Sequence, residues 1–514
     1  MKTLKKWIAL LCAASMLFSL AACSEPAAEE TKKDTEAVNS ADPNETEAET
    51  EDDGSLFKTV KDDLPADLKL DGLKVTFLSR GVPKVANEIH VEEMTGEVVN
   101  DAVFQREITV EDGLDCTIAN IATGTDNHGN ELLNMVSTSV AASDGAYDIL
   151  ANSNWSTANT YPTGYYMNLH NVENLNLDKE YWAQHLIDST EINGALFSVT
   201  GSLSLFLYQS MFAVFFNRNL CEQYGMQPAD IYNTVFEGKW TLDQMIAMTK
   251  DIYQDKNGDG IADENDVYGF GLQVSSSTDG YWSSCQIRMT TRDSDGVVKL
   301  DTDLEKLVSV VERLQDFAYN QKGVVRLVEA SDMANGFYLP EAFAKDQILF
   351  MNDWIYTTGT GVFRDMESDY GIIPYPKYDE AQDNYYSYIH DQFTTFSMLC
   401  TVASPAAVGA VMEAMASDSH NRVIPAYYEI ALSQKYARDQ DSVTSLQTIF
   451  ENAYLDTGWV YSLNMNSYPQ GVLREPVWRN TNTSVTFIAR MGKMAEKSLE
   501  KIMKSFDKIA DSQS

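Results

Sequence analysis

Lys74-Val75-Thr76-Phe77-Leu78 decides the fold class, because this β-branched and aromatic run predicts a short strand that begins a repeating pattern. A helix is expected over 98–110, a strand over 116–118, a helix over 131–140 and a strand over 147–150. Strands that alternate with helices predict a parallel α/β sheet that is covered on both faces. Ligands of such sheets bind in loops beyond the carboxyl ends of the strands.

The pattern continues through a folded part of roughly 440 residues. This length exceeds what a single hydrophobic core supports, so two lobes or more are expected. This folded part is expected to begin near 68–73 and to end near 509. Further helices are expected over 240–253, 304–317 and 485–509, and further strands over 268–272 and 348–351.

The amino terminus has the pattern of a bacterial export signal. Lys2, Lys5 and Lys6 precede an apolar run over 7–22 that is shorter than a confident membrane span. The run ends in Leu-Ala-Ala-Cys23, which resembles the lipobox of bacterial lipoproteins. The resemblance implies a signal peptide over 1–22, diacylglycerol on Cys23 and a further acyl chain (palmitate) on the new amino terminus. It places the protein on the outer, extracellular face of a Gram-positive-type cytoplasmic membrane; a secretory signal that merely contains a cysteine is the alternative.

The segment after Cys23 is expected to be a disordered acidic tether over 23–66. Residues 24–53 contain 12 acidic and 2 basic residues and almost no large apolar ones, so they cannot bury enough surface to fold. The whole chain has a formal net charge of −38, which argues against nucleic acid or an anionic membrane surface as a partner. Contact with the membrane is expected through the lipid alone.

Four cysteines remain in the exported part, at positions far apart in the chain and without CxxC spacing. An even number in an exported protein permits disulfides, and buried free thiols are an equal expectation. The spacing indicates no zinc site. These residues are Cys116, Cys221, Cys285 and Cys400.

Four blocks resemble, in order, those of extracellular solute-binding protein family 1, the sugar receptors of ABC importers that include maltose-binding protein. They are 216–225, 240–245, 343–351 followed by Trp354, and 370–377. The resemblance covers most of 73–399, and Asp346-Gln347 departs from the small-residue turn of the family. Each block is weak alone, and their order after a lipobox gives them weight.

The resemblance implies a periplasmic-binding-protein-like α/β fold, with two lobes around a ligand cleft and a hinge. The lobes are expected over 67–200 with 341–400, and over 201–340 with 401–510. The implied function is that of a monomeric cell-surface lipoprotein, not an enzyme. It would capture a carbohydrate, in particular an oligosaccharide, by lobe closure and deliver it to an ABC transporter permease.

A sugar needs flat aromatic rings against its C–H faces and planar polar groups for its hydroxyls. Trp354 matches the tryptophan of the family that stacks on ligand, and a core tryptophan is the alternative. Asn152 and Trp155 lie in the loop after the strand at 147–150, where the family contacts ligand. Weaker candidates, for which structural roles are favoured, are Tyr208, Trp282, Asp391 and Trp459.

Residues 255–266 fit the spacing of a calcium loop and predict a structural Ca²⁺ site. Gly260 stands at the sixth position, where the loop turns sharply, and the twelfth position is Asp instead of Glu. No helix–loop–helix is expected, so the loop is interpreted as a structural calcium site that stabilises the fold. An acidic turn that binds no ion is the alternative. The expected ligands are Asp255, Asn257, Asp259, the Ile261 carbonyl, Asp263 and Asp266.

Two other classes stay open. An exported carbohydrate-active hydrolase is opposed by the lack of GxSxG, HExxH and P-loop motifs, although a pair of catalytic carboxylates would leave no motif. A calcium-dependent surface adhesion module is suggested by the calcium loop, but adhesion proteins repeat such loops and this sequence has one.

Overall fold

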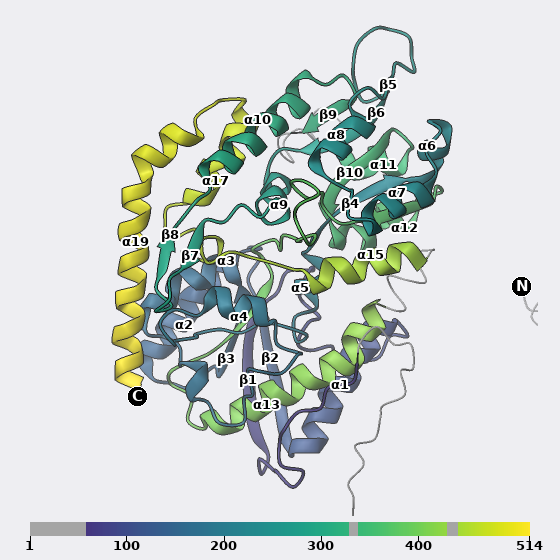
Figure 1. Cartoon of the computed structure of the whole chain (residues 1–514). Helices are drawn as coiled ribbons and strands as arrows, with labels where there is room; N and C mark the ends of the chain where they lie inside the picture. Colours follow the sequence, from purple (N-terminus) through teal and green to yellow (C-terminus); the bar gives the residue numbers. More distant parts are fainter. Residues whose placement is uncertain (1–57, 328–337, 429–439, 514) are drawn as a thin grey trace, which may run out of the picture. The chain divides into compact units, whose positions relative to one another are not determined.

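Two β-sheets with helices packed against them organise the protein in this computed structural model, which describes residues 58–327, 338–428 and 440–513 (Figure 1). The predicted signal peptide, Cys23 and most of the predicted tether lie outside the described residues. Within those ranges no helix combines the length and the apolar character needed to cross a bilayer.

The first sheet has the strand order β12-β3-β1-β2. Strand β1 (Leu73–Arg80) runs parallel to β2 (Cys116–Thr123) and β3 (Ile149–Ser153), and β12 (Thr394–Met398) is antiparallel to β3. Side chains of β1 alternate between two apolar clusters, one containing α2 and the other containing α1 and α13. The predicted α/β sheet with both faces covered is therefore confirmed, and its first three strands are parallel as predicted, but β12 makes the sheet mixed. Its helices are α1 (Val98–Leu114), α2 (Asn130–Ala142) and α13 (Pro405–Asp418).

The second sheet has the order β11-β4-β10-β6-β5, and β9 pairs with β6 in addition. Strand β10 is parallel to β6 and antiparallel to β4, so this sheet is mixed. Every residue of β4 is buried, as expected for a strand covered on both faces. The strands are β4 (Phe212–Asn217), β5 (Tyr253–Gln254), β6 (Val267–Gln273), β9 (Val324–Leu327), β10 (Ile348–Trp354) and β11 (Tyr370–Ile373).

Helices and a small hairpin complete the described chain. The hairpin consists of β7 (Thr290–Arg292) and β8 (Val298–Leu300). The α-helices are α3 (Asn154–Thr157), α4 (Gln184–Thr190), α5 (Leu205–Gln209), α6 (Arg218–Gln223), α7 (Pro228–Phe236), α8 (Leu242–Thr249), α9 (Ser276–Ser284), α10 (Leu304–Asn320), α11 (Leu339–Ala344), α12 (Gly361–Arg364), α15 (Gln440–Glu451), α16 (Thr457–Val460), α17 (Tyr468–Val472), α18 (Arg474–Arg479) and α19 (Ser484–Gln513). Short 3₁₀ or π turns are η1 (Ala158–Thr163), η2 (Leu169–Asn171), η4 (Ile355–Gly359) and η5 (Ser419–Val423).

The helix predicted over 240–253 is shorter than expected, because α8 ends at Thr249. The carbonyls of Lys250 and Ile252 accept hydrogen bonds from the amides of Gly323 and Gly269, both at 2.8 Å, instead of continuing the helix. Its amino terminus is as predicted, since the Thr241 side chain caps it by accepting from the backbone N–H of Gln244 at 3.2 Å.

Two neighbouring chain segments connect the sheets. The Phe212 amide donates to the Tyr388 carbonyl at 3.0 Å, and the His390 amide donates to the Ser210 carbonyl at 2.9 Å. We call residues 388–393 the crossing segment, because they lead directly into β12 of the first sheet. The second sheet includes β10 and β11, which lie within the range 341–400 expected for the first lobe; the lobe boundaries themselves stay a prediction.

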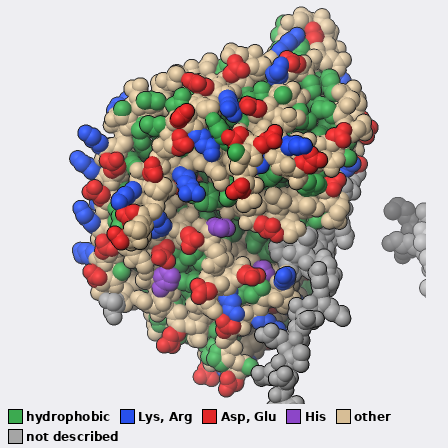
Figure 2. All heavy atoms as spheres, in the orientation of Figure 1, with side chains coloured by type: hydrophobic (Ala, Val, Ile, Leu, Met, Phe, Trp, Pro, Cys, Tyr) green, Lys and Arg blue, Asp and Glu red, His purple; other side chains and the backbone are tan. Residues whose placement is uncertain are grey.

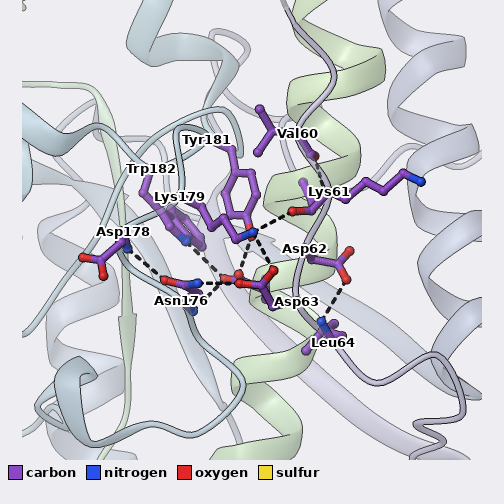
Figure 3. A network of polar contacts seen from close by, with 12 residues as sticks. Val60, Lys61, Asp62, Asp63, Leu64, Asn176, Asp178, Lys179, Tyr181 and Trp182 are labelled. Carbon is purple, nitrogen blue, oxygen red and sulfur yellow. Dashed lines mark hydrogen bonds and ion pairs between the residues drawn. The ribbon is translucent and has the colours of Figure 1, made fainter. Parts of the chain in front are cut away.

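Residues 58–64 form a strap that is docked beside the first sheet (Figure 3). Lys179 donates to the Lys61 carbonyl and to the Asp63 carboxylate, and Val60 exchanges backbone hydrogen bonds with the Asn421 side chain. Val60 and Leu64 also pack against the apolar cluster of the first sheet. Contacts with the folded part thus begin within the range 23–66 expected for the tether.

The four cysteines of the described residues are free thiols. Cys116, Cys221 and Cys285 are buried, and burial raises the pKa of the Cys116 thiol to about 11. Cys400 is exposed. The expectation of buried thiols thus holds for three of the four.

Candidate functional site

A cavity of about 190 Å³ lies at the carboxyl ends of β6 and β10. This is the place where ligands bind in α/β sheets, because parallel strands present their loops there. The cavity is lined by aromatic rings, amides, one carboxyl and an imidazole. Its residues are Phe212, Gln273, Ser276, Leu327, Tyr338, Leu339, Pro340, Asn352, Asp353, Trp354 and His390.

Trp354, predicted as the stacking residue, is the last residue of β10 and is partly buried in an aromatic cluster. Its ring lies 5.0 Å from the imidazole of His390 and 6.0 Å from the ring of Phe206. The Lys84 ammonium lies over the indole, 4.1 Å from the ring centroid. A cation at this distance is attracted to the ring, so Lys84 covers one face of the surface on which a sugar would stack.

Asn352 has a side-chain amide that the protein satisfies poorly. The residue is 1% exposed and lines the cavity, and neither its Oδ1 nor its Nδ2 makes a hydrogen bond of normal geometry within the described chain, although the amide lies near enough to the Tyr375 hydroxyl to oppose the rise of that group's pKa. Its neighbour Tyr375 donates its hydroxyl hydrogen to the Ser277 carbonyl at 3.0 Å. Because an unpaired buried amide is costly, this residue marks a place where a ligand could supply both a donor and an acceptor.

Asp353 is the carboxyl of the cavity. Its Oδ2 accepts from the Thr357 hydroxyl and its Oδ1 from the Trp354 amide, both at 2.8 Å. Burial raises the pKa of Asp353 to about 6, and the nearby positive charge of Lys84 opposes that rise. Burial also lowers the pKa of Lys84.

The loop that carries Lys84 is held by a buried group of charges at the end of β1. Arg80 donates to the Thr394 hydroxyl at 2.8 Å, and that hydroxyl donates to Glu88 at 2.5 Å. Glu88 also accepts from the Phe206 amide at 2.7 Å. Burial raises the pKa of Glu88 and lowers that of Arg80 to about 10. These bonds bring the ends of β1 and β12 to the base of α5.

The crossing segment joins this cavity to the predicted residues after β3. The Trp155 amide donates to the Asp391 carbonyl at 2.9 Å, and the Asn154 amide donates to the Phe393 carbonyl at 3.0 Å. The side chain of Asn154 is buried without a hydrogen-bond partner among the described residues. His390 Nδ1 lies 3.1 Å from Asp391 Oδ1. Trp155 and Asp391 are therefore linked to Trp354 through His390, but neither of them lines the cavity.

Asn152 is fully buried at the end of β3. Its Nδ2 donates to the Gly129 carbonyl at 3.3 Å, while its Oδ1 has no partner within the described chain. Gly129 has a φ of +68°, and a Cβ there would lie 1.8 Å from Asn152 Oδ1. The amide therefore fits because residue 129 is a glycine.

Trp282 and Trp459 are buried core residues that belong to a row of rings leading to the cavity. Their centroids are 6.1 Å apart, and Trp459 lies 5.5 Å from Tyr388, which lies 5.6 Å from Phe212. Tyr208 lies elsewhere: it packs edge-on against Phe450 at 5.3 Å and lines a separate groove.

Sequence reasoning missed Lys84, Asn352, Asp353 and His390. Asn352 and Asp353 stand between the block 343–351 and Trp354, both assigned to the family resemblance, so their position was a usable signal. Lys84 follows Ser79-Arg80-Gly81-Val82-Pro83, a run typical of a loop after the first strand, and the loops at strand ends are where ligands bind. The contact between His390 and the Trp354 ring joins residues distant in the chain and left no sequence signal.

The predicted calcium loop lies apart from this cavity. Its turn forms as expected, since Gly260 has a φ of +75° and the Asp255 carboxylate accepts from the Gly258 and Gly260 amides. Asp266 is buried, and its carboxylate accepts from the Tyr253 hydroxyl at 2.7 Å and the Lys256 amide at 3.1 Å. Among the described residues no three His, Cys, Asp or Glu side chains are grouped to hold a metal. The calcium site stays a prediction.

Comparisons with known proteins identify the fold. No protein-family model and no curated protein matches the chain. Solved structures do match, at low sequence identity. UspC from M. tuberculosis shares 14% identity with a TM-score of 0.53, and the match covers 83% of this chain and 100% of that protein. The galacto-N-biose/lacto-N-biose I-binding protein of the ABC transporter from Bifidobacterium longum shares 12% with a TM-score of 0.51, covering 85% and 98%.

An ABC transporter solute-binding protein from Thermotoga lettingae shares 12% identity with a TM-score of 0.51, covering 84% of this chain and 100% of its own. The chain therefore has the α/β fold of ABC-transporter solute-binding proteins. The periplasmic-binding-protein-like fold predicted from the sequence is confirmed.

Proposed function

We propose that this protein is a solute-binding receptor that captures a carbohydrate in the cavity beside Trp354 and delivers it to an ABC transporter permease. The observation that carries the proposal is Asn352, whose buried amide lines the cavity without a hydrogen bond of normal geometry to the described chain. Sugar hydroxyls both donate and accept, and the aromatic rings of the cavity suit the C–H faces of a sugar.

The comparisons support a sugar as the solute class. The Bifidobacterium longum protein is described in complex with lacto-N-biose, and the Thermotoga lettingae protein as bound with α-D-tagatose. Both are binding proteins, which favours capture over catalysis in this chain as well. The oligosaccharide preference remains part of the proposal.

A thermal-shift screen of mono- and oligosaccharides tests the function, since a ligand that binds only the folded protein raises the unfolding midpoint. For a sugar that binds, Asn352→Ala is expected to weaken binding by about tenfold or more, because two hydrogen bonds are lost. Asn384→Ala removes the same group from a different cavity and serves as the control. Hydrolysis of an oligosaccharide, or a response only to peptides, would refute the proposal.

We also propose that lipid on Cys23 anchors the receptor and that Ca²⁺ occupies the 255–266 loop. Mass spectrometry of the amino-terminal peptide tests the lipid anchor, with Cys23→Ser as the unmodified control.

In the proposed calcium site, Asp255, Asn257 and Asp259 would supply side-chain oxygens, and the ion would stabilise the loop before β6. Asp266 would have to exchange one of its present donors for the ion.

A further inference from the structure

The carboxy-terminal helix α19 packs on the protein through one side. Ala495, Leu499, Ile502 and Phe506 are buried along it, and the Phe506 ring lies 4.7 Å from that of Phe197. At 3.6 residues per turn these four positions fall within an arc of about 60° around the helix axis. The opposite side of α19 therefore faces away from the core.

That opposite side carries a continuous row of cations, which we call the basic stripe. Its residues recur every three or four positions, so all six fall within about 80°, centred roughly 170° from the buried side. All are exposed, and the row is about 27 Å long at 1.5 Å per residue. Figure 2 shows Lys and Arg side chains gathered along the left edge, where α19 lies in Figure 1. The stripe consists of Arg490, Lys493, Lys497, Lys501, Lys504 and Lys508.

Most cations of the stripe form no close ion pair within the described chain, although the four carboxylates of α19 reduce the local excess on the helix to two positive charges. Within the described chain, Lys504 alone among the six has an ion pair, a loose one of 4.0 Å with Glu500. The Arg490 guanidinium lies over the Phe487 ring at 5.5 Å. The acidic residues of α19 lie along one edge of the stripe. This concentration is notable in a chain with 38 basic and 76 acidic residues.

We propose that the basic stripe docks on the anionic headgroups of a lipid surface, a contact that rests on the proposed membrane location of the receptor. The row is straight, exposed and on the outer side of a helix, so it suits a flat partner better than a small ion. Five of the six residues are lysines, which act as point charges and do not select a ligand by geometry. The overall negative charge of the chain opposes such a contact, but acidic groups more than about 8 Å from the stripe are screened at physiological salt. The carboxylates of α19 are nearer and lie along one edge of the stripe.

The lipid anchor makes a weak contact effective. A tethered protein meets its membrane at a high effective concentration. A modest contribution of each basic residue to the binding free energy is therefore enough to keep the helix on the surface. Each Lys or Arg near an anionic surface contributes about fivefold to binding at low salt. The stripe would thus hold a tethered receptor against the surface along α19 and leave the cavity near Trp354 on another part of the molecule.

Vesicle co-sedimentation tests the stripe, with the full chain carrying Cys23→Ser so that no lipid anchor contributes. Vesicles of phosphatidylcholine alone are compared with vesicles containing equal parts of phosphatidylglycerol. Binding to the anionic vesicles is expected to exceed binding to the neutral ones and to fall with added salt. The triple variant Lys497→Gln, Lys501→Gln, Lys504→Gln is expected to lose at least tenfold in affinity.

The matched control replaces three exposed lysines elsewhere, Lys239, Lys299 and Lys345, by glutamine. Both triple variants keep residues 1–22 and have the same net charge. They therefore differ only in the place from which the three positive charges have been removed. Equal loss in both variants, or no preference for anionic vesicles, would overturn the proposal. Loss caused by inorganic phosphate but not by sodium chloride of equal ionic strength would indicate a discrete phosphate site instead. A failed sugar screen would not affect these outcomes.

Discussion

The carboxyl of Asp353 provides a quantitative test of the cavity. Its pKa is raised to about 6 from an ordinary value of 3.8, chiefly by burial. A raised pKa means that the folded protein prefers the protonated carboxyl, so the ionised form destabilises the fold. That penalty is complete above pH 6, shrinks as the pH falls toward 3.8 and is absent below it.

The expected magnitude follows from the same values. Their difference corresponds to about 3 kcal/mol, and because the side chain is only partly buried we take about half of this, ~1.5 kcal/mol. Asp353→Asn removes the charge and keeps the shape. The amide oxygen of asparagine can accept only one of the two bonds from Thr357 and Trp354, and the part of that loss that does not depend on pH cancels when the two pH values are compared.

Urea unfolding of wild type and Asp353→Asn at about pH 8 and about pH 4 measures the effect. The variant should gain about 1.5 kcal/mol relative to wild type on going from the lower to the higher pH. Asp365→Asn, at an exposed position, is the control and should show no such gain. A variant whose difference from wild type is the same at both pH values would refute the reasoning.

Three further changes test other parts of the structure. Glu413→Ala should lower stability by about 2–3 kcal/mol, measured by urea unfolding, because it leaves the buried Trp182 Nε1–H without its acceptor; an effect below that of a surface substitution would contradict this. Arg474→Met should cost about 3–5 kcal/mol by leaving the buried Asp279 carboxylate unpaired. The double variant with Asp279→Leu should recover part of that lost stability. If the two substitutions instead destabilise additively, the Arg474–Asp279 ion pair does not contribute as described. Removal of Ca²⁺ with a chelator should lower the thermal midpoint of the wild type but not of Asp255→Asn; equal midpoints with and without Ca²⁺ in the wild type would exclude the site.

Local periodicity predicted the first sheet well, because strands such as β1 and helices such as α1 bury one side and leave a repeating pattern. The periodicity predicted too long a helix at α8, because the carbonyls of Lys250 and Ile252 accept hydrogen bonds from distant glycines instead of from the next turn of the helix. The predicted stacking residue Trp354 lies at a cavity, but Lys84 over its ring depends on packing between distant loops.

The poorly satisfied amide of Asn352 was beyond sequence reasoning for a similar reason. Whether a buried polar group has a partner is decided by every neighbour in three dimensions, and no local pattern records it. The strap was also missed, because residues 58–64 look polar and loosely patterned, while their partners Ser417 and Asn421 lie more than 350 positions away.

The strap determines where force enters the molecule. It is held by Lys179, Ser417 and Asn421, all beside the first sheet, and none of these residues belongs to the crossing segment. A pull on the amino-terminal end at Lys58 is therefore borne by the helices around that sheet before it reaches the connection between the sheets. This route does not pass through the crossing segment, so tension on the strap would not by itself alter the connection between the two sheets.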